Sequence, residues 1–243
     1  MQRVIIIGAY SAIAEAVARE YAKRGAALFL VGRDLQRLDA VADDLRVRGA
    51  VDTKTWELDV NSLDQHAPML EAARAALGGI DIALIAHGTL PSQEKCDASV
   101  ETALREFSTN GTSTIGLGLV MVPYLQRGAT LAVISSVAGD RGRASNYLYG
   151  SAKAAVSAFF SGLGQRLRTE GVNILVVKPG FVDTPMTAGF KKGALWASPE
   201  VVARGIVRAI DRRKAVVYLP WFWWGIMQII KNIPESIFRR IRL

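Results

Sequence analysis

The sequence predicts an α/β fold in which helices cover both faces of a parallel, doubly wound sheet. Short runs of branched apolar residues alternate with longer segments of helical composition, as right-handed crossovers between parallel strands require. Each apolar run is followed by glycine, proline or a polar residue. The 243 residues, half of them hydrophobic, can bury one sizeable core, and no repeat or low-complexity segment interrupts them.

Seven strands are expected, with helical segments between most of them. The strands are placed at residues 3–7, 27–31, 53–58, 81–86, 130–134, 172–178 and 215–219. The first helical segment ends near residue 25, and later ones span 35–48, 62–77, 99–122 and 149–170. We therefore expect one domain over residues 1–220, followed by an aromatic and basic extension at 221–243.

The first strand runs into a turn that is suited to a phosphate. A strand, a tight turn and a helix direct backbone N–H groups and a helix N-terminus at such a group. The three glycines usual in a dinucleotide-binding turn are represented here by Gly8, Ala12 and Ala14. Alanine is tolerated at the third place, but the methyl group of Ala12 is expected to hold a pyrophosphate further away. The candidate cofactor residues of this turn are Gly8, Tyr10, Ser11 and Ile13.

The end of the second strand bears on the choice of cofactor. The strand leads into Gly32, Arg33 and Asp34. A guanidinium suits a ribose 2′-phosphate, whereas an acidic residue suits a 2′-hydroxyl. Asp34 also has the character of an N-cap for the helix that follows. We therefore favour NADP(H) over NAD(H), with an exposed loop cation as the alternative reading of Arg33.

Further candidates follow other predicted strands. In a parallel α/β sheet, ligands lie outside the carboxyl ends of the strands. Gly8, Arg33, Asp59, Gly88, Ser136 and Pro179 all lie at such ends.

A phenol and an amine are four residues apart in Tyr149-Gly150-Ser151-Ala152-Lys153. On a helix this spacing puts both groups on one face, where the ammonium would lower the phenol pKa into a range useful for acid–base catalysis. Ser136 follows an apolar run and could donate a hydrogen bond to a carbonyl oxygen. Taken alone, the Tyr–Lys spacing is also compatible with an ordinary surface helix.

Composition excludes several classes of function. Cys96 is the single cysteine, so no internal disulfide can form and a cytoplasmic setting is expected; it lies in a polar stretch and is expected to be a loop thiol. The apolar run at the N-terminus is too short for a signal peptide or a spanning helix. The net charge is +8, but the basic residues are scattered and no nucleic-acid motif is present. With two histidines and no zinc spacing, no metal site is expected.

These motifs together resemble the short-chain dehydrogenases/reductases over residues 3–186. The resemblance implies a Rossmann-type sheet and hydride transfer between a nicotinamide cofactor and a ketone or secondary alcohol, in a homodimer or homotetramer. The usual Asn-Asn-Ala-Gly is replaced by Ile85-Ala86-His87-Gly88, where His87 is expected to lie beside the cofactor rather than contact the substrate. The residues that carry the resemblance are Gly8, Ala12, Ala14, Asp59, Val60, Asn110, Ser135, Ser136, Tyr149, Lys153, Pro179, Gly180, Thr184, Pro185 and Met186.

The resemblance implies a role for each of four catalytic residues. Tyr149 would donate a proton to the carbonyl oxygen, and Lys153 would lower the tyrosine pKa and hold the nicotinamide ribose. Ser136 would polarise the carbonyl, and Asn110 would hold a water that relays protons. A cofactor-binding regulatory protein without turnover is the alternative. The remaining cofactor residues implied are Asp59, Val60, Ala86, Gly88, Pro179, Val182 and Thr184.

The C-terminal extension combines Trp221, Phe222, Trp223 and Trp224 with a basic tail. Aromatic rings next to cations are typical of a helix at a membrane interface, which would place the protein at the inner face of the membrane. Such aromatic residues also line substrate pockets and dimer contacts. The tail resembles the reductases of decaprenylphosphoryl 2-keto-pentoses, which implies a lipid-linked keto-substrate. The tail's basic residues are Lys231, Arg239, Arg240 and Arg242.

Overall fold

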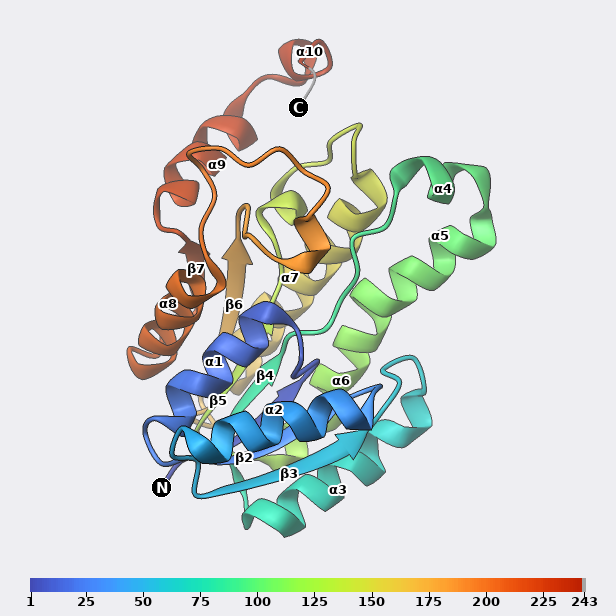
Figure 1. Ribbon diagram of the computed structural model, residues 1–243. Coiled ribbons are helices and arrows are strands. Elements are labelled where there is room, and N and C mark those ends of the chain that lie inside the picture. The colour runs from blue at the N-terminus through green and yellow to red at the C-terminus, as the bar shows by residue number, and fades with distance from the viewer. Residues whose placement is uncertain (242–243) are drawn as a thin grey trace.

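The computed structural model describes residues 1–241 and confirms the predicted architecture. Its strands form a seven-stranded parallel sheet in the order β3-β2-β1-β4-β5-β6-β7 (Figure 1). The strands are β1 Arg3–Ile7, β2 Ala27–Gly32, β3 Asp52–Glu57, β4 Ile80–Ile85, β5 Leu125–Ile134, β6 Asn173–Pro179 and β7 Val216–Leu219.

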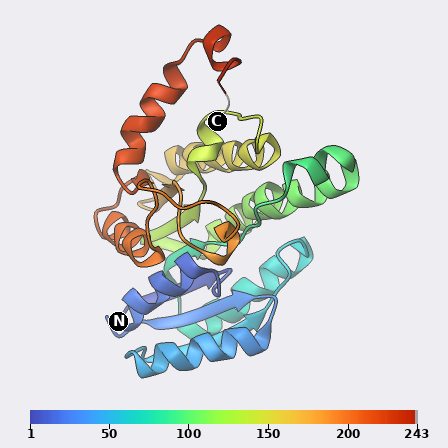
Figure 2. The same cartoon turned by 45° about the horizontal axis from the view of Figure 1, so that its top comes forward.

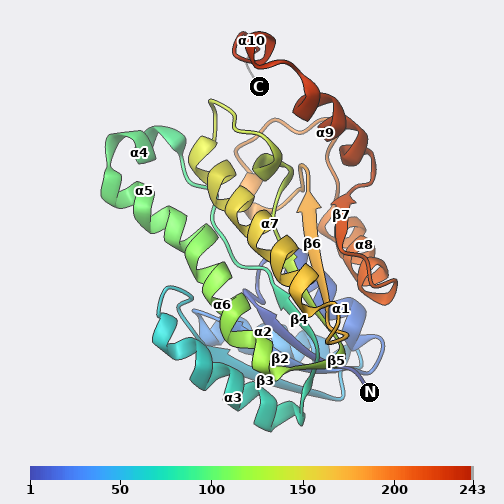
Figure 3. The ribbon, with the colours of Figure 1, turned by 180° about the vertical axis from the view of Figure 1, so that it is seen from behind.

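Helices cover both faces because alternate residues of each strand point to opposite layers. In β1, Val4 and Ile6 belong to the core under α1, α2 and α8. Ile5 and Ile7 belong to the core under α3, α6 and α7, the layer that Figure 3 shows from behind. The helices are α1 Ala12–Ala22, α2 Leu35–Val47, α3 His66–Leu77, α4 Gln93–Ala98, α5 Val100–Phe107, α6 Ser113–Met121, α7 Tyr147–Leu167, α8 Pro199–Asp211, α9 Phe222–Asn232 and α10 Glu235–Phe238.

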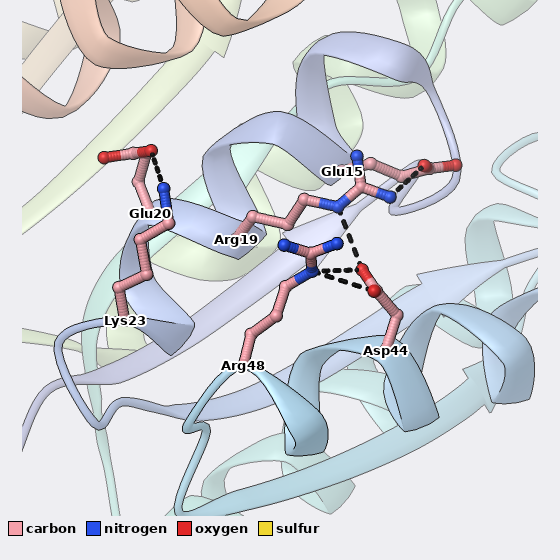
Figure 4. A network of polar contacts seen from close by, with 6 residues as sticks. All are labelled: Glu15, Arg19, Glu20, Lys23, Asp44 and Arg48. Carbon is pink, nitrogen blue, oxygen red and sulfur yellow. Dashed lines mark hydrogen bonds and ion pairs between the residues drawn. The ribbon is translucent and has the colours of Figure 1, made fainter.

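Ion pairs join α1 to α2 on the outer face of the molecule. Arg19 of α1 donates to the Asp44 carboxylate of α2 at 2.9 Å, and Arg48 donates to the same group at 2.8 Å (Figure 4). Glu15 lies 3.5 Å from Arg19. These side chains are a quarter to two-fifths exposed, and surface pairs contribute about 0–1 kcal/mol each. Apolar burial under the helices therefore dominates the packing.

Two expectations for residues 91–122 need correction. The stretch around Cys96 is not a loop but contains α4, which Ser92 caps through its hydroxyl, and Cys96 is 5% exposed. The long helix expected over residues 99–122 is also not a single α-helix. A π-helical turn at Ser108–Thr112 separates α5 from α6. Such turns are rare overall, but where they occur they are often found at functional sites.

The C-terminal segment packs beyond the carboxyl ends of β6 and β7 (Figure 2). In α9, Trp223 is 3% exposed and Met227 is fully buried, and both belong to one buried cluster with Val137. No helix in residues 1–241 is long and apolar enough to cross a membrane. The basic tail residue Arg242 lies outside the described residues.

Candidate active site

A cavity of about 470 Å³ lies at the carboxyl edge of the sheet. Every site residue expected from the sequence lines it, although these residues come from segments far apart in the chain. They are Gly8, Tyr10, Ser11, Ile13, Arg33, Asp59, Val60, Ala86, Gly88, Asn110, Ser136, Tyr149, Lys153, Pro179, Val182 and Thr184.

The tyrosine and the lysine lie one turn apart in the first part of α7. The Lys153 ammonium is 5.8 Å from the centroid of the Tyr149 ring and donates to the backbone carbonyl of Ile134 at 3.0 Å. Ser136, just beyond β5, lies close enough to the Tyr149 phenol to act on its pKa. The end of β5 thus positions both the serine and the ammonium beside the phenol.

The pKa of Tyr149 does not shift in the expected direction. Burial raises the pKa of Tyr149 to about 12, with the Ser136 hydrogen bond acting in the opposite direction. Burial also lowers the pKa of Lys153 to about 8. The predicted lowering of the tyrosine pKa by Lys153 is therefore wrong for this structure, because loss of hydration on burial raises that pKa and the effect that opposes it comes from Ser136. Tyr149 is a protonated acid at neutral pH.

Asn110 lies in the π-helical turn and is 1% exposed. Its side-chain oxygen accepts from the Thr89 N–H at 3.0 Å, and its amide donates to the Thr89 hydroxyl at 2.8 Å. A Cβ on Gly88 would lie 2.9 Å from the Asn110 oxygen and 3.5 Å from Lys153 Nζ. Glycine is therefore needed at residue 88, which also has a φ of +155°. Thr89 has no motif of its own, and sequence reasoning missed its part in this site.

The turn after β1 is packed against His87. Gly8 has a φ of +81°, and a Cβ there would lie 2.7 Å from the His87 backbone. The His87 ring lies 2.9 Å from the Ser113 hydroxyl and 3.1 Å from that of Thr114. Burial lowers the pKa of His87 to about 3, so the ring is neutral. His87 therefore packs against the turn, and its expected place beside the cofactor stays a prediction.

The N-terminus of α1 borders the cavity beside this turn. The Ser11 hydroxyl caps the helix by accepting from the Ala14 N–H at 3.3 Å. Ala12 and Ile13, the first two residues of α1, line the cavity. The positive end of the helix dipole is therefore available to an anion, whereas Ala14 is fully buried in the core.

Two arginines and a tyrosine form the end of the cavity near β2. The Tyr10 hydroxyl accepts from the Arg33 N–H at 3.2 Å, and the Arg37 guanidinium lies 4.5 Å from the centroid of the Tyr10 ring. Asp34 caps α2 by accepting from the Arg37 N–H at 3.1 Å, which confirms the N-cap prediction. Sequence reasoning missed Arg37, although the N-cap at Asp34 places it in the first turn of α2.

The other predicted cavity residues follow β3, β4 and β6. Asp59 accepts from the Asn61 N–H at 3.0 Å. The Ala86 N–H donates to the carbonyl of Ile7 at 2.8 Å, which joins the ends of β1 and β4. Val182 forms a β-bridge with Ala197. Sequence reasoning missed several other residues that line the cavity, which are Leu90, Arg143, Asn146 and Phe190.

Comparison with known proteins identifies the family. Residues 2–194 match the short chain dehydrogenase family. An uncharacterized oxidoreductase of Mycobacterium tuberculosis is 34% identical over 240 residues, covering 98% of this chain and 96% of its own length. An uncharacterized oxidoreductase of Streptomyces coelicolor is 34% identical over 243 residues, covering 98% and 95%.

Solved structures share the fold at lower identity. A putative dehydrogenase from Burkholderia cenocepacia with bound NADP has a TM-score of 0.81 and 19% identity, covering 89% of this chain and 91% of its own. A variant of actinorhodin polyketide ketoreductase with NADPH has a TM-score of 0.80 and 20% identity, covering 96% and 98%. The family match and the curated relatives together show that this chain belongs to the short-chain dehydrogenase/reductase family of oxidoreductases.

Proposed function

We propose that the protein catalyses NADP(H)-dependent interconversion of a ketone and a secondary alcohol. The observation that carries this proposal is the arrangement of Ser136, Tyr149 and Lys153 around one cavity, with the serine close enough to the tyrosine to act on its pKa. The phenol is protonated at neutral pH and therefore carries a proton that it can donate to a carbonyl oxygen. The N-terminus of α1 also lies at the cavity, where it could bind the pyrophosphate of the cofactor.

Each residue has a defined part in the reduction. A bound nicotinamide cofactor supplies the hydride. Tyr149 donates its phenolic proton to the carbonyl oxygen, and Ser136 donates a hydrogen bond to the same oxygen. The Lys153 ammonium stabilises the phenolate that remains. Asn110 fixes the segment at Thr89 beside Lys153 and holds a water that returns a proton.

The residues present fit a phosphorylated dinucleotide. At Gly8 a Cβ would clash with the His87 backbone, which keeps the turn bare, and the first residues of α1 face the cavity. Arg33 and Arg37 flank Tyr10 where a 2′-phosphate would lie, and the Asp34 carboxylate is engaged by its own helix. Residues Pro179, Val182 and Thr184 would cover the nicotinamide. Similar structures hold NADP and NADPH, which also supports NADP(H).

The direct test is NADPH oxidation by the purified protein with a panel of aliphatic and aromatic ketones. Calorimetric binding of NADPH is measured in parallel. We expect tight binding of NADPH and turnover of at least one ketone. Absence of NADPH binding would contradict the cofactor proposal, whereas binding without any turnover would support the regulatory alternative.

We further propose that the substrate is hydrophobic or lipid-linked and that α9 contacts the inner face of the cytoplasmic membrane. Trp221, Trp224 and Ile229 are 81%, 58% and 70% exposed, and Lys231 lies in the last turn of α9, which Trp221 precedes as N-cap. Exposed aromatic residues suit the headgroup layer, and each nearby cation adds about 1 kcal/mol at an anionic leaflet.

We also propose a homodimer or homotetramer, on the basis of exposed apolar residues on α5, α6 and α7. Leu104 of α5 is 65% exposed and Leu119 of α6 is 52% exposed. Leu119 also borders a shallow groove with Phe159 of α7. Light scattering of the wild-type protein and of Leu119→Glu tests this: a dimer or larger assembly should become monomeric in the variant.

A further inference from the structure

Arg143, in the loop before α7, is a cation that forms no ion pair with any residue that the structure describes. Its Nε atom is buried and has no hydrogen-bond partner. Its Nη2 lies 3.7 Å from the thioether sulfur of Met227, which is the only side-chain hydrogen-bond partner of Arg143 among residues 1–241. Among residues 1–241, no carboxylate forms an ion pair with Arg143. The nearby Asp140 is engaged by Lys178 and by the Tyr218 hydroxyl, which donates to it at 2.7 Å.

Such an arrangement is costly unless something completes it. Burial lowers the pKa of Arg143, against the raising effect of Asp140, so the charged form has lost hydration that the protein does not replace. Buried polar groups are nearly always hydrogen-bonded, and each exception calls for an explanation. The planar guanidinium presents paired N–H donors whose spacing matches the oxygens of a carboxylate or a phosphate.

The position of Arg143 relates it to the reaction. It lines the same cavity as Tyr149, six residues before it in the chain. Asn146 lies between them at the N-cap of α7, where it makes no side-chain cap bond, and its Oδ1 is also buried without a partner. The positive end of the α7 dipole lies at this point. Two incompletely bonded polar side chains thus line the cavity that also contains the proton donor.

The loop that carries Arg143 is anchored to the C-terminal segment. Arg141 donates to the carbonyls of Ile230 at 2.7 Å and Ile233 at 2.6 Å. Its guanidinium also lies 3.8 Å from the centroid of the Phe238 ring. Arg143 is therefore held in place before a ligand arrives, which lowers the ordering cost of binding.

The surroundings describe the rest of the ligand. Phe181, Met186 and Phe190, which follow β6 in the chain, line the same cavity as Arg143. Resting on the proposed oxidoreductase function, we propose that Arg143 binds an anionic group of the substrate, so that the enzyme prefers ketones whose apolar body carries a carboxylate or a phosphate. Both groups share anionic oxygens, and the experiment separates them.

The test uses three ketones with one acetophenone frame. 4-Acetylbenzoate carries a carboxylate, 4-acetylphenyl phosphate carries a phosphate, and methyl 4-acetylbenzoate is neutral. For the wild type, we expect kcat/KM for at least one anion to be about tenfold or more above that for the ester, since a charged hydrogen bond has this strength. The anion with the larger ratio identifies the group.

Variants then assign the preference to Arg143. Arg143→Met keeps an apolar stem beside Met227 and should lose the preference about 10- to 100-fold, with the ester reduced as before. Arg143→Lys keeps a positive charge but lacks the paired N–H donors of the guanidinium, so it should retain part of the preference for the anionic ketone. Arg204→Ala is the matched control, because Arg204 is exposed on α8 and lies outside the cavity lining. Equal losses on all three ketones in Arg143→Met would overturn the proposal.

A binding measurement separates this proposal from the proposed function. The Kd values of 4-tert-butylbenzoate and phenyl phosphate are measured by calorimetry in the presence of NADP⁺. We expect the Kd of the preferred anion to weaken at least about tenfold in Arg143→Met and to stay unchanged in Arg204→Ala. Arg143-dependent binding without reduction of any ketone would support the anion site and contradict the oxidoreductase proposal. Wild-type protein that binds neither anion would overturn the anion site.

Discussion

Trp223 of α9 lies directly against Gly180, the residue that follows β6. A Cβ on Gly180 would lie 1.9 Å from Trp223 Nε1, and the Trp223 ring also meets Phe181 edge-on, with centroids 5.3 Å apart. The C-terminal helix therefore packs on the segment that lines the cavity. Gly180 leaves the space that this contact needs.

Substituting Gly180→Ala should displace α9. Overpacking costs about 1–3 kcal/mol, so we expect a lower melting temperature in circular dichroism and a higher KM as Phe181 moves. Gly225→Ala, in the same helix with no atom within 4 Å of the added Cβ, is the matched control and should be neutral or slightly stabilising. Equal melting temperatures for the two variants would contradict the close contact.

Tyr149→Phe keeps the ring and removes the proton donor. General acid catalysis is worth about 10²–10⁴ in rate, so kcat should fall at least about a hundredfold while the Kd of NADPH stays nearly the same. Stopped-flow turnover and calorimetry measure the two quantities. Unchanged turnover would remove Tyr149 from the mechanism.

Lys153 should set an alkaline limit on reduction. Its pKa is about 8 and that of Tyr149 is about 12, so above pH 8 the lysine loses its charge while the tyrosine keeps its proton. The phenolate formed by proton donation then lacks a stabilising cation, and kcat/KM should fall as pH rises through 8. In Lys153→Arg the cation persists and the limb should move to higher pH. If the fall in kcat/KM still occurs near pH 8 in this variant, a group other than Lys153 causes it.

Arg33→Ala should weaken NADPH and leave NADH nearly unchanged. Hydrogen bonds to charged groups contribute about 1.5–3 kcal/mol, which corresponds to a ten- to a hundredfold increase in the Kd of NADPH. Arg37→Ala tests in the same way whether the guanidinium that lies over the Tyr10 ring also binds the 2′-phosphate. If both variants bind the two cofactors as the parent does, the 2′-phosphate is recognised elsewhere or not at all.

The exposed face of α9 should bind anionic membranes. In co-sedimentation, we expect the protein to bind vesicles that contain anionic lipid, to bind neutral vesicles weakly, and to be released by salt. Replacing Trp221, Trp224 and Ile229 together by serine should abolish binding without unfolding, because these side chains are exposed. Val47→Ser, at an equally exposed apolar position on α2, should have no effect. Protein that stays in the supernatant throughout would favour a pocket or dimer role for the aromatics.

The sheet and the gathering of the site residues were predictable because both follow from local patterns. An apolar run such as that in β1 identifies a strand, and parallel topology then brings Gly8 and Ser136 to one edge. The direction of the Tyr149 pKa was not predictable, since it depends on burial by distant segments. The same holds for Arg143, whose isolation appears only when Asp140 is seen to be bonded to Lys178. The proposed roles of these residues remain predictions.

The π-helical turn at Ser108–Thr112 adds one residue to a helical path. Successive residues of an α-helix are rotated by about 100°, so this insertion sets the angular phase between α5 and α6. It allows Asn110 to reach Thr89 while Leu117 and Met121 stay fully buried under the sheet. If one residue were removed from this turn, either Leu117 and Met121 would turn away from the core or Asn110 would turn away from Thr89. Chain length between Phe107 and Ser113 is therefore as tightly constrained as side-chain identity.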